Sequence, residues 1–478
     1  MAKSFFLKQA AWFKDSLQEF TVPDEFEIDM IAPVDAPALS RDMIKESIYH
    51  PFGPSLKNLT QGKTKIVFVV DDLGRPTPAH DIIPYVLEIL STSGVLSQDI
   101  SFIVATGSHR QLSREDMARK VGATIVDSYR VTCHDAFKSP LKDLGYSRNG
   151  FPCIANKEVA EADLIIGIGC VIPHSCHGFG GGAKLFCPGI AGMESIVTMH
   201  GFTPKRGRGN IDNPKNDWDM RSASEAFVAK LPPIFLINVV MNSQREISAI
   251  FSGSIQNVFE AARIKASEVY RTEILEDQKT KYDVILINAY PLDSDPVQSA
   301  KSPWVKNMFP DTIQIHINSS ADGVDYHGWK VFRRSNWFTL VVASIAEGLT
   351  FPIVPKFFNN ISSWPIIRFL REHLVRLLVR ISHADFDTYL SCRVAIEKSK
   401  SREASSVSGP DRNRTPWVYS EYFTDAEFKK KYSKGTLFKD WKSVVEGIKK
   451  YYPKAKIAVV TCAPVQIPVV KGSHDSTH

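Results

Sequence analysis

Five short apolar runs, rich in β-branched residues, recur between residues 66 and 287 of this chain. Most are followed by turn residues and then by a stretch with helical periodicity. A strand that is apolar on both faces has to be covered on both faces, and this alternation is typical of parallel sheets. The pattern predicts an α/β fold with a mostly parallel sheet covered by helices. The predicted strands are Ile66–Val70, Phe102–Ala105, Leu164–Ile168, Phe235–Val240 and Val284–Ile287.

Helices are predicted between these strands at residues 82–90 and 258–269. Ser113, followed three residues later by Asp116, forms the pattern of a capping box at a helix start. The order of elements is therefore that of repeated strand, loop and helix units.

A charged break at residues 276–281 precedes the last of these strands. A chain of 478 residues is long enough for two cores of ordinary size. We therefore expect two α/β domains, residues 1–275 and 280–478, each built on a mostly parallel sheet, with the active site in the cleft between them. Within the second, residues 364–381 are predicted to form an amphipathic helix and residues 398–414 a flexible polar loop.

The composition points to a cytoplasmic protein that acts on a small molecule. The formal charge is only +6, and the basic residues are spread along the chain, which argues against nucleic acid as a partner. Neither a signal peptide nor a membrane-spanning run is recognisable, and the basic helix at 364–381 lacks a lipid anchor, so we expect no membrane binding. A small anionic substrate suits this charge.

Three predicted strands end in polar loops that packing alone does not require. These loops are residues 71–78, which contain Asp72 and Arg75, residues 105–110, and residues 167–184. Because the carboxyl ends of parallel strands line one crevice, we expect the three loops to converge on a single site.

The third loop contains the glycine run Gly180, Gly181 and Gly182, and Lys184 follows two residues later. Such glycines let backbone N–H groups approach a phosphate closely. The Walker pattern is absent, because Ala183 precedes the lysine and Leu185 follows it. Two interpretations stay open at this point: a phosphate cradle, or a tight connection between a strand and a helix.

His109 and His174 each lie just past a predicted strand. A neutral imidazole there can take up a proton and return it near pH 7, and two such bases suit a reaction on either face of a carbon atom. Taken singly, a histidine in such a loop is more often a hydrogen-bonded structural residue. Cys170, His174, Cys176 and His177 also offer a zinc site, although their crowded order lacks the usual CxxC pair.

In the second half, Gln298 and Lys301 are three residues apart at the start of a predicted helix and would share one face. They are candidates to meet a substrate carboxylate or a phosphate across the cleft. An exposed lysine on a helix is the alternative.

These motifs together resemble those of the lactate racemase family. The resemblance covers residues 71–78, 105–110, 173–189 with His200, and 290–301, in order and spacing, and it extends over most of residues 60–325. It implies an isomerase that racemises or epimerises 2-hydroxy acids by reversible hydride transfer, through a 2-keto acid.

The same resemblance implies a cofactor and a set of roles. The cofactor would be a nickel-pincer nucleotide, a pyridinium-3-thioamide-5-thiocarboxylate mononucleotide with nickel, attached covalently at Lys184 and supplied by cofactor-biosynthesis enzymes. His200 would be the protein ligand of nickel. His109 and His174 would be the catalytic bases. Arg75, Gln298 and Lys301 would hold the substrate, with Asp72 orienting its neighbours and Gly180, Gly181 and Gly182 lining the cofactor.

Departures from the family pattern concern the substrate. Gly180 stands where the family usually has serine, and Val297 where lactate racemases have tyrosine. We therefore expect a substrate larger than lactate. The alternatives are a non-catalytic nickel- or nucleotide-binding protein, and a transferase that uses the glycine-rich loop to bind a nucleotide.

Overall fold

The computed structural model describes most of the chain, and every structural statement below refers to that part. The described residues are 2–202, 209, 219–299, 301–323, 416–432 and 435–471. The predicted helix at 364–381 and the predicted loop at 398–414 lie outside them.

A six-stranded sheet forms the first α/β unit, with strand order β13-β12-β9-β4-β5-β6. Neighbouring strands are parallel except for β12 and β13, which are antiparallel. The strands are β4 (Ile66–Asp71), β5 (Ile100–Ala105), β6 (Arg130–Cys133), β9 (Leu164–Cys170), β12 (Ile234–Met241) and β13 (Ile247–Gly253). Every residue of β4, β5 and β9 is buried, as their unbroken apolar sequences predict.

Helices cover both faces of this sheet. The predicted helices are confirmed as α3 (Ala79–Thr92) and α9 (Ile255–Val269), and Ser113 caps α4 (Arg114–Val121) in a complete capping box with Asp116. Because successive side chains of a strand point to opposite faces, Phe68 joins one core cluster, whereas Val67 joins the other.

A second six-stranded sheet is parallel throughout, with strand order β18-β17-β16-β15-β19-β3. The predicted strand at residue 284 is confirmed as β15. The other elements are β3 (Glu27–Ile31), β15 (Val284–Asn288), β16 (Ile313–Ile317), β17 (Trp417–Tyr419), β18 (Thr436–Phe438), β19 (Lys456–Val460), α11 (Pro303–Met308), α15 (Asp425–Lys431) and α16 (Trp441–Tyr451). The predicted fold class, two mostly parallel sheets covered by helices, is therefore confirmed.

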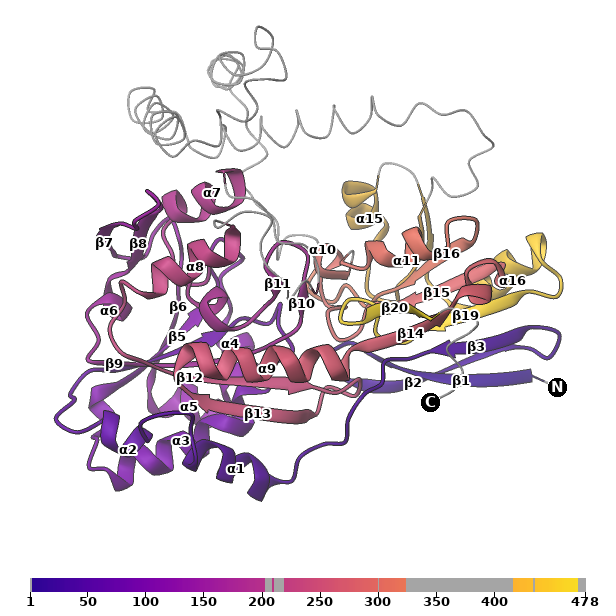
Figure 1. The fold of residues 1–478 in the computed structure, drawn as a ribbon. Helices are drawn as coiled ribbons and strands as arrows, with labels where there is room; N and C mark the ends of the chain where they lie inside the picture. The colour runs from indigo at the N-terminus through magenta and orange to yellow at the C-terminus, as the bar shows by residue number, and fades with distance from the viewer. Residues whose placement is uncertain are drawn as a thin grey trace, which may run out of the picture.

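The start of the chain packs on the second sheet. Strands β1 (Ala2–Gln9) and β2 (Ser16–Pro23) form a hairpin, whose Phe5 and Phe20 lie in the core of the second unit, and β3 pairs with β19. Figure 1 shows these indigo strands beside the orange and yellow ones. The predicted domain boundary between residues 275 and 280 stays a prediction, but strands β1 to β3, which it assigns to the first domain, pack on or pair with the second sheet.

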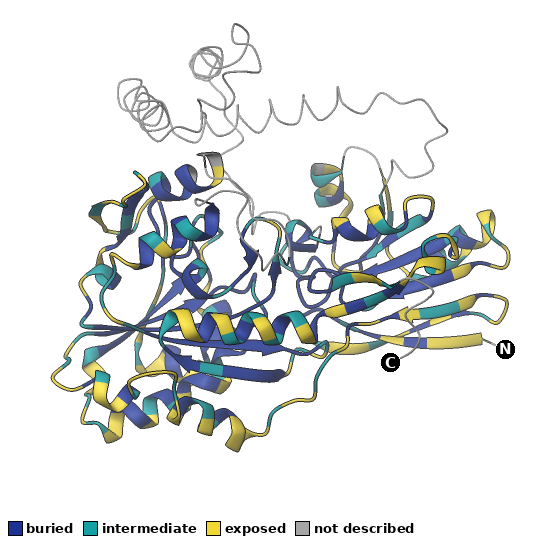
Figure 2. Ribbon diagram, in the orientation of Figure 1, coloured by how far each residue is buried: buried dark blue, intermediate teal, exposed yellow. Residues whose placement is uncertain are grey.

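The remaining elements are short or lie at the edges of the two units. They are α1 (Arg41–Tyr49), α2 (Leu56–Leu59), α5 (Ala123–Ser128), β7 (Leu141–Tyr146), β8 (Pro152–Asn156), α6 (Lys157–Ala160), β10 (Pro173–His174), β11 (Gly178–Phe179), α7 (Met193–Phe202), α8 (Met220–Val228), β14 (Arg271–Leu275), α10 (Pro296–Ser299) and β20 (Ile467–Lys471). Figure 2 shows that the central strands of both sheets are mostly buried, while the helices expose their outer faces. Within the described ranges, no helix is both long and apolar enough to pass through a bilayer.

Candidate active site

The loops that follow β4, β5 and β9 meet in one pocket of about 270 Å³. Its lining includes nearly all of the side chains that the sequence singled out: Asp72, Arg75, His109, His174, Lys184, His200, Gln298 and Lys301. Of the glycine run, Gly181 lines the pocket. The convergence predicted from the ends of parallel strands is therefore observed.

His109 is held by a carboxylate. Its Nδ1 lies 2.5 Å from Oδ2 of Asp72, which is buried and also accepts a hydrogen bond from the Gly74 amide at 2.9 Å. A carboxylate accepts the Nδ1 proton, so the neutral ring carries its lone pair on Nε2. This is the arrangement of a base oriented by an acidic partner.

Behind this corner lies a buried ion pair that no sequence pattern indicated. Lys120 Nζ is 2.5 Å from Asp71 Oδ1 and donates a hydrogen bond to the carbonyl of Arg75 at 3.2 Å. The other carboxylate oxygen of Asp71 accepts hydrogen bonds from the Thr77 hydroxyl and from the Cys170 amide. The pair thus ties the Arg75 loop to α4 and to the end of β9.

Burial opposes the charge of both partners of this ion pair. It raises the pKa of Asp71 and lowers the pKa of Lys120, while their mutual attraction acts against both shifts. Nothing in the sequence distinguishes Lys120 from the other charged residues of α4, so sequence reasoning could not single it out.

His174 is held by backbone amides. Its Nδ1 accepts hydrogen bonds from the N–H groups of Cys176 at 3.2 Å and His177 at 3.3 Å. Burial lowers the pKa of His174 well below its ordinary value, and the nearby charges of Lys184 and Lys301 lower it further. The ring is therefore neutral, with its proton on Nε2.

Two of the three glycines are required by the local packing. Gly181 and Gly182 have φ angles of +77° and +56°, and a Cβ atom would lie 2.7 Å from Val171 or from Phe259, respectively. Gly180 differs, because a Cβ atom there would make only ordinary contacts with Ile172. A serine at Gly180 would fit this backbone.

The loop is also fixed by Asn238 of β12, a residue that no sequence pattern singled out. This buried amide accepts a hydrogen bond from the Gly182 N–H at 2.9 Å and donates one to the carbonyl of Gly169 at 3.1 Å.

Lys184 lies in a cationic environment. Burial and then the charge of Arg75 lower its pKa to about 7, so a large share of the amine is neutral at physiological pH. Lys301 shows the same effect, since burial and the charges of Arg75 and Lys184 bring its pKa well below the ordinary value. A bound anion would relieve the repulsion among these three groups.

Gln298 and Lys301 reach the pocket from the second unit. The predicted helix there is a single turn, α10, so Lys301 lies just beyond its end, and the Lys301 amide donates to the carbonyl of Gln298 at 3.0 Å. The two residues therefore line one pocket without sharing the face of a longer helix.

His200 lies in the helix predicted to follow the glycine-rich loop. Its Nδ1 is 2.7 Å from the carbonyl of Ile196, and a carbonyl can only accept, so the ring donates from Nδ1 and its lone pair is on Nε2. A backbone carbonyl fixes the tautomer of metal-binding histidines in this way.

The alternative zinc site finds no support in this geometry. In the part of the chain that the structure describes, no three His, Cys, Asp or Glu side chains are grouped as a metal site requires. Burial also raises the pKa of Cys170 to about 12, which keeps it a thiol.

This chain is similar in sequence to known lactate racemases. The family profile "Lactate racemase N-terminal domain" matches residues 13–209. A lactate racemase of Thermoanaerobacterium thermosaccharolyticum is 30% identical over 305 residues, which span 62% of this chain and 68% of the relative. This chain belongs to the lactate racemase family. A second lactate racemase, from Lactiplantibacillus plantarum, is 32% identical over 303 residues, 61% of this chain and 68% of the relative.

Solved structures support the fold. The lactate racemase apoprotein of T. thermosaccharolyticum aligns with a TM-score of 0.61 at 20% identity, over 98% of this chain and 100% of that one. A Thermotoga maritima protein aligns with a TM-score of 0.55 at 17% identity, over 92% of this chain and all of the other. Membership of the lactate racemase family confirms the resemblance inferred from the motifs and makes this protein an isomerase.

Proposed function

We propose that this member of the lactate racemase family inverts the C2 centre of a 2-hydroxy acid, using a nickel-pincer nucleotide attached at Lys184. One observation carries the proposal: His109, His174, Lys184 and His200 line the same pocket as the cationic side chains Arg75 and Lys301. Such a pocket suits a small anion that must lose and regain a hydrogen atom.

The residues present fit the cofactor. The Lys184 amine, with its pKa near 7, is nucleophilic enough at neutral pH to form an amide-type bond. His200 presents an Nε2 lone pair, a suitable donor for nickel. When bound, the nucleotide supplies the acceptor for the hydrogen that leaves C2 as hydride.

The two histidines act on the substrate hydroxyl group. His109 takes up the hydroxyl proton at Nε2 while Asp72 stabilises the resulting imidazolium. His174, expected from the sequence to be the second base, carries its proton on Nε2 because Nδ1 accepts from two amides, so in this protonation state it would instead donate a hydrogen bond to the oxygen of the developing 2-keto acid. Return of the hydrogen to the opposite face of C2, together with return of the proton from His109 Nε2 to the oxygen, would complete the inversion.

Arg75, Gln298 and Lys301 hold the substrate carboxylate. Burial and the charge of Arg75 lower the pKa of Lys301, and both side chains line a partly buried pocket, where an ion pair is stronger than in water. Gln298 adds an amide that can donate to the same carboxylate.

We further propose a substrate larger than lactate, such as malate, 2-hydroxyglutarate or an aldonic acid. Its support is the small side chain at Val297 and the glycine at Gly180, which the packing does not require. Initial rates with both enantiomers of each acid test this point, and faster turnover of lactate than of the larger acids would contradict it.

The experiment that tests the main proposal is co-production with the cofactor-biosynthesis enzymes, followed by intact mass, peptide mapping, nickel analysis and a chiral assay. We expect a nucleotide-sized mass on the Lys184 peptide, about one nickel per chain by the family chemistry, and conversion of one enantiomer into the other. Lys184→Arg keeps the charge and should lose the added mass and the activity. An unmodified Lys184 with reversible nucleotide binding would instead favour a phosphate clamp.

A further inference from the structure

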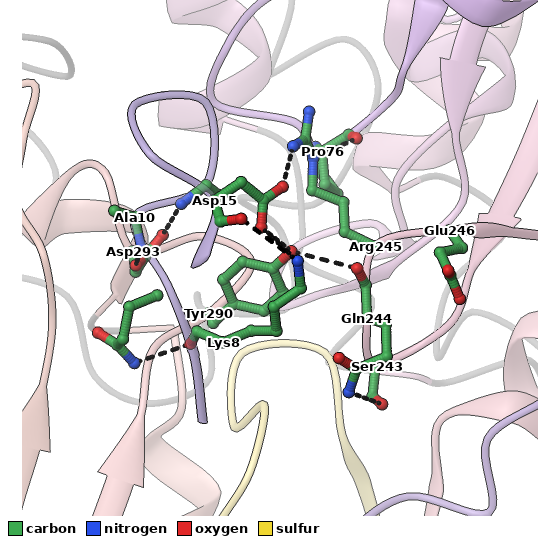
Figure 3. Close-up of polar contacts among 12 residues, drawn as sticks. Lys8, Ala10, Asp15, Pro76, Ser243, Gln244, Arg245, Glu246, Tyr290 and Asp293 are labelled. Carbon is green, nitrogen blue, oxygen red and sulfur yellow. Dashed lines mark hydrogen bonds and ion pairs between the residues drawn. The ribbon is translucent and has the colours of Figure 1, made fainter. Parts of the chain in front are cut away.

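The loop that joins β1 and β2, residues 10–15, lies between the two α/β units. Its hairpin packs on the second sheet, but its tip reaches the loops of the first sheet. Figure 3 shows Asp15 of this loop between Arg245, which follows β12, and Tyr290, which follows β15. Asp15 accepts from Arg245 at 2.5 Å and from the Tyr290 hydroxyl at 2.9 Å, so one carboxylate contacts both units.

Trp12, three residues earlier, lies beneath two cations. The Cζ atom of Arg245 lies 3.8 Å from the centre of a Trp12 ring, and the Nζ atom of Lys120 lies 4.8 Å from such a centre. Both distances are those of cation–π contacts, which are stronger where water is excluded. Trp12 itself is buried.

These two cations hold consecutive carbonyl groups of the loop that carries Arg75. Lys120 donates to the carbonyl of Arg75, and Arg245 donates from Nε to the carbonyl of Pro76, each at 3.2 Å. The ring of Trp12 therefore packs against both groups that fix the backbone of Arg75 and Pro76.

Trp12 adopts this place at a cost. Its backbone φ angle is +74°, a left-handed conformation that residues other than glycine rarely adopt. Its indole N–H is also buried without a hydrogen-bond partner in the described structure. Neither feature favours a tryptophan. We therefore attribute the tryptophan at this position to the contacts of its ring with Lys120 and Arg245.

We propose that Trp12 is a positioning residue for Arg75: it braces Lys120 and Arg245, and through them it sets where the Arg75 guanidinium stands in the pocket. The inference rests on the proposed function in assigning Arg75 to the substrate carboxylate. It connects the start of the chain, through the hairpin on the second sheet, to a substrate-binding group of the first unit.

A double-mutant cycle with Trp12→Ala and Arg75→Lys in the nickel-loaded protein tests the proposal. Loss of the cation–π contacts in Trp12→Ala should raise KM for the 2-hydroxy acid about tenfold, with a smaller change in kcat. In the Arg75→Lys background, Trp12→Ala should raise KM no further. Trp12→Phe keeps an aromatic face, drops the unpartnered N–H, and should restore the KM of the unaltered protein.

Hydrogen exchange of the unloaded protein supplies a second readout, which does not depend on activity. Trp12→Ala should speed exchange of the backbone amides in residues 72–78, whereas Trp12→Phe should not. If Trp12→Ala folds poorly, Arg245→Lys keeps a charge for Asp15, removes the Nε donor to Pro76, and should show the same local increase.

The outcomes separate the two proposals. Unchanged exchange in residues 72–78, or fully additive effects of the two substitutions on KM, would overturn the role of Trp12. If Arg75→Lys alone leaves KM unchanged while exchange still responds to Trp12→Ala, the assignment of Arg75 to the carboxylate fails. In that case Trp12 still stabilises the backbone of residues 72–78, but its role in substrate binding through Arg75 is overturned.

Discussion

The two walls of the pocket hold their histidines by different means. On the wall formed after β4 and β5, His109 meets the carboxylate of Asp72, whereas on the wall formed after β9, His174 meets two backbone amides. A carboxylate stabilises a protonated ring, and amide donors at Nδ1 oppose one. The same residue type is thus prepared to accept a proton on one side and to remain neutral on the other.

The largest expected effect tests the carboxylate wall. Asp72→Asn replaces a carboxylate, which can only accept, by an amide that can also donate and so no longer fixes the His109 tautomer, and that carries no charge to stabilise the imidazolium. We expect kcat to fall by about 10² to 10⁴ in the nickel-loaded protein, measured by the chiral assay. Asp135→Asn, a carboxylate that caps a turn outside the pocket lining, is the control and should retain its activity. A change in kcat below about threefold in Asp72→Asn would mean that catalysis by His109 does not depend on this carboxylate.

The next effect concerns the ion pair behind that wall. Lys120→Met leaves Asp71 buried without its cation, which should lower the free energy of unfolding by about 3–5 kcal/mol in urea titrations. Adding Asp71→Asn should recover much of this loss. Arg114→Met removes one partner of an exposed ion pair with Asp127 and should change stability far less. An equal loss of unfolding free energy in Lys120→Met and Arg114→Met would show that burial does not make the Lys120–Asp71 pair more important than an exposed pair.

The environment of His174 predicts that the stability of the protein depends on pH. Because the folded pKa of His174 is lowered, the unfolded chain takes up a proton as pH falls below about 6.5, whereas the folded chain does not. This contribution to stability is therefore present above that pH and is lost on acidification, at up to about 1.4 kcal/mol per pH unit.

Urea titrations between pH 7 and pH 5 measure this slope. His174→Gln should reduce it. His316→Gln removes another imidazole, in the second sheet, whose pKa is lowered to about 4 by desolvation, and should reduce the slope as well while sparing the pocket. An unchanged slope in His174→Gln would contradict a neutral His174.

The smallest effect is spectroscopic. In long-range ¹H–¹⁵N spectra of the unloaded protein at pH 7, His174 should appear as the Nε2–H tautomer and His109 as the Nδ1–H tautomer, assigned by His→Gln variants. Identical tautomers at the two positions would contradict the conclusion that Nδ1 donates in His109 and accepts in His174.

The parts of this protein that the sequence predicted are those that follow from local rules. Unbroken apolar runs predicted the buried strands, and the rule that parallel strands end at one edge of a sheet predicted that His109 and His174 lie in one site.

The parts that the sequence did not predict depend on contacts between distant residues. Lys120 is one of several charged residues in α4, and only the fold shows that it reaches Asp71, 49 positions away in the chain. Strands β1 to β3 mix apolar with polar and charged residues and bury few of them, because they cover one side of a sheet or lie at its edge. They therefore lack the unbroken apolar run that predicted the other strands.

The pairing of β3 with β19 has a consequence for biosynthesis. Residues 27–31 leave the ribosome more than 400 residues before the strand they pair with, at residues 456–460. During translation the first sheet has all its strands by residue 253, while the β1–β3 segment must wait beside it, exposing the apolar side chains of Phe5 and Phe20. For this segment, the time spent unpaired is set by the rate of protein synthesis instead of the rate of folding.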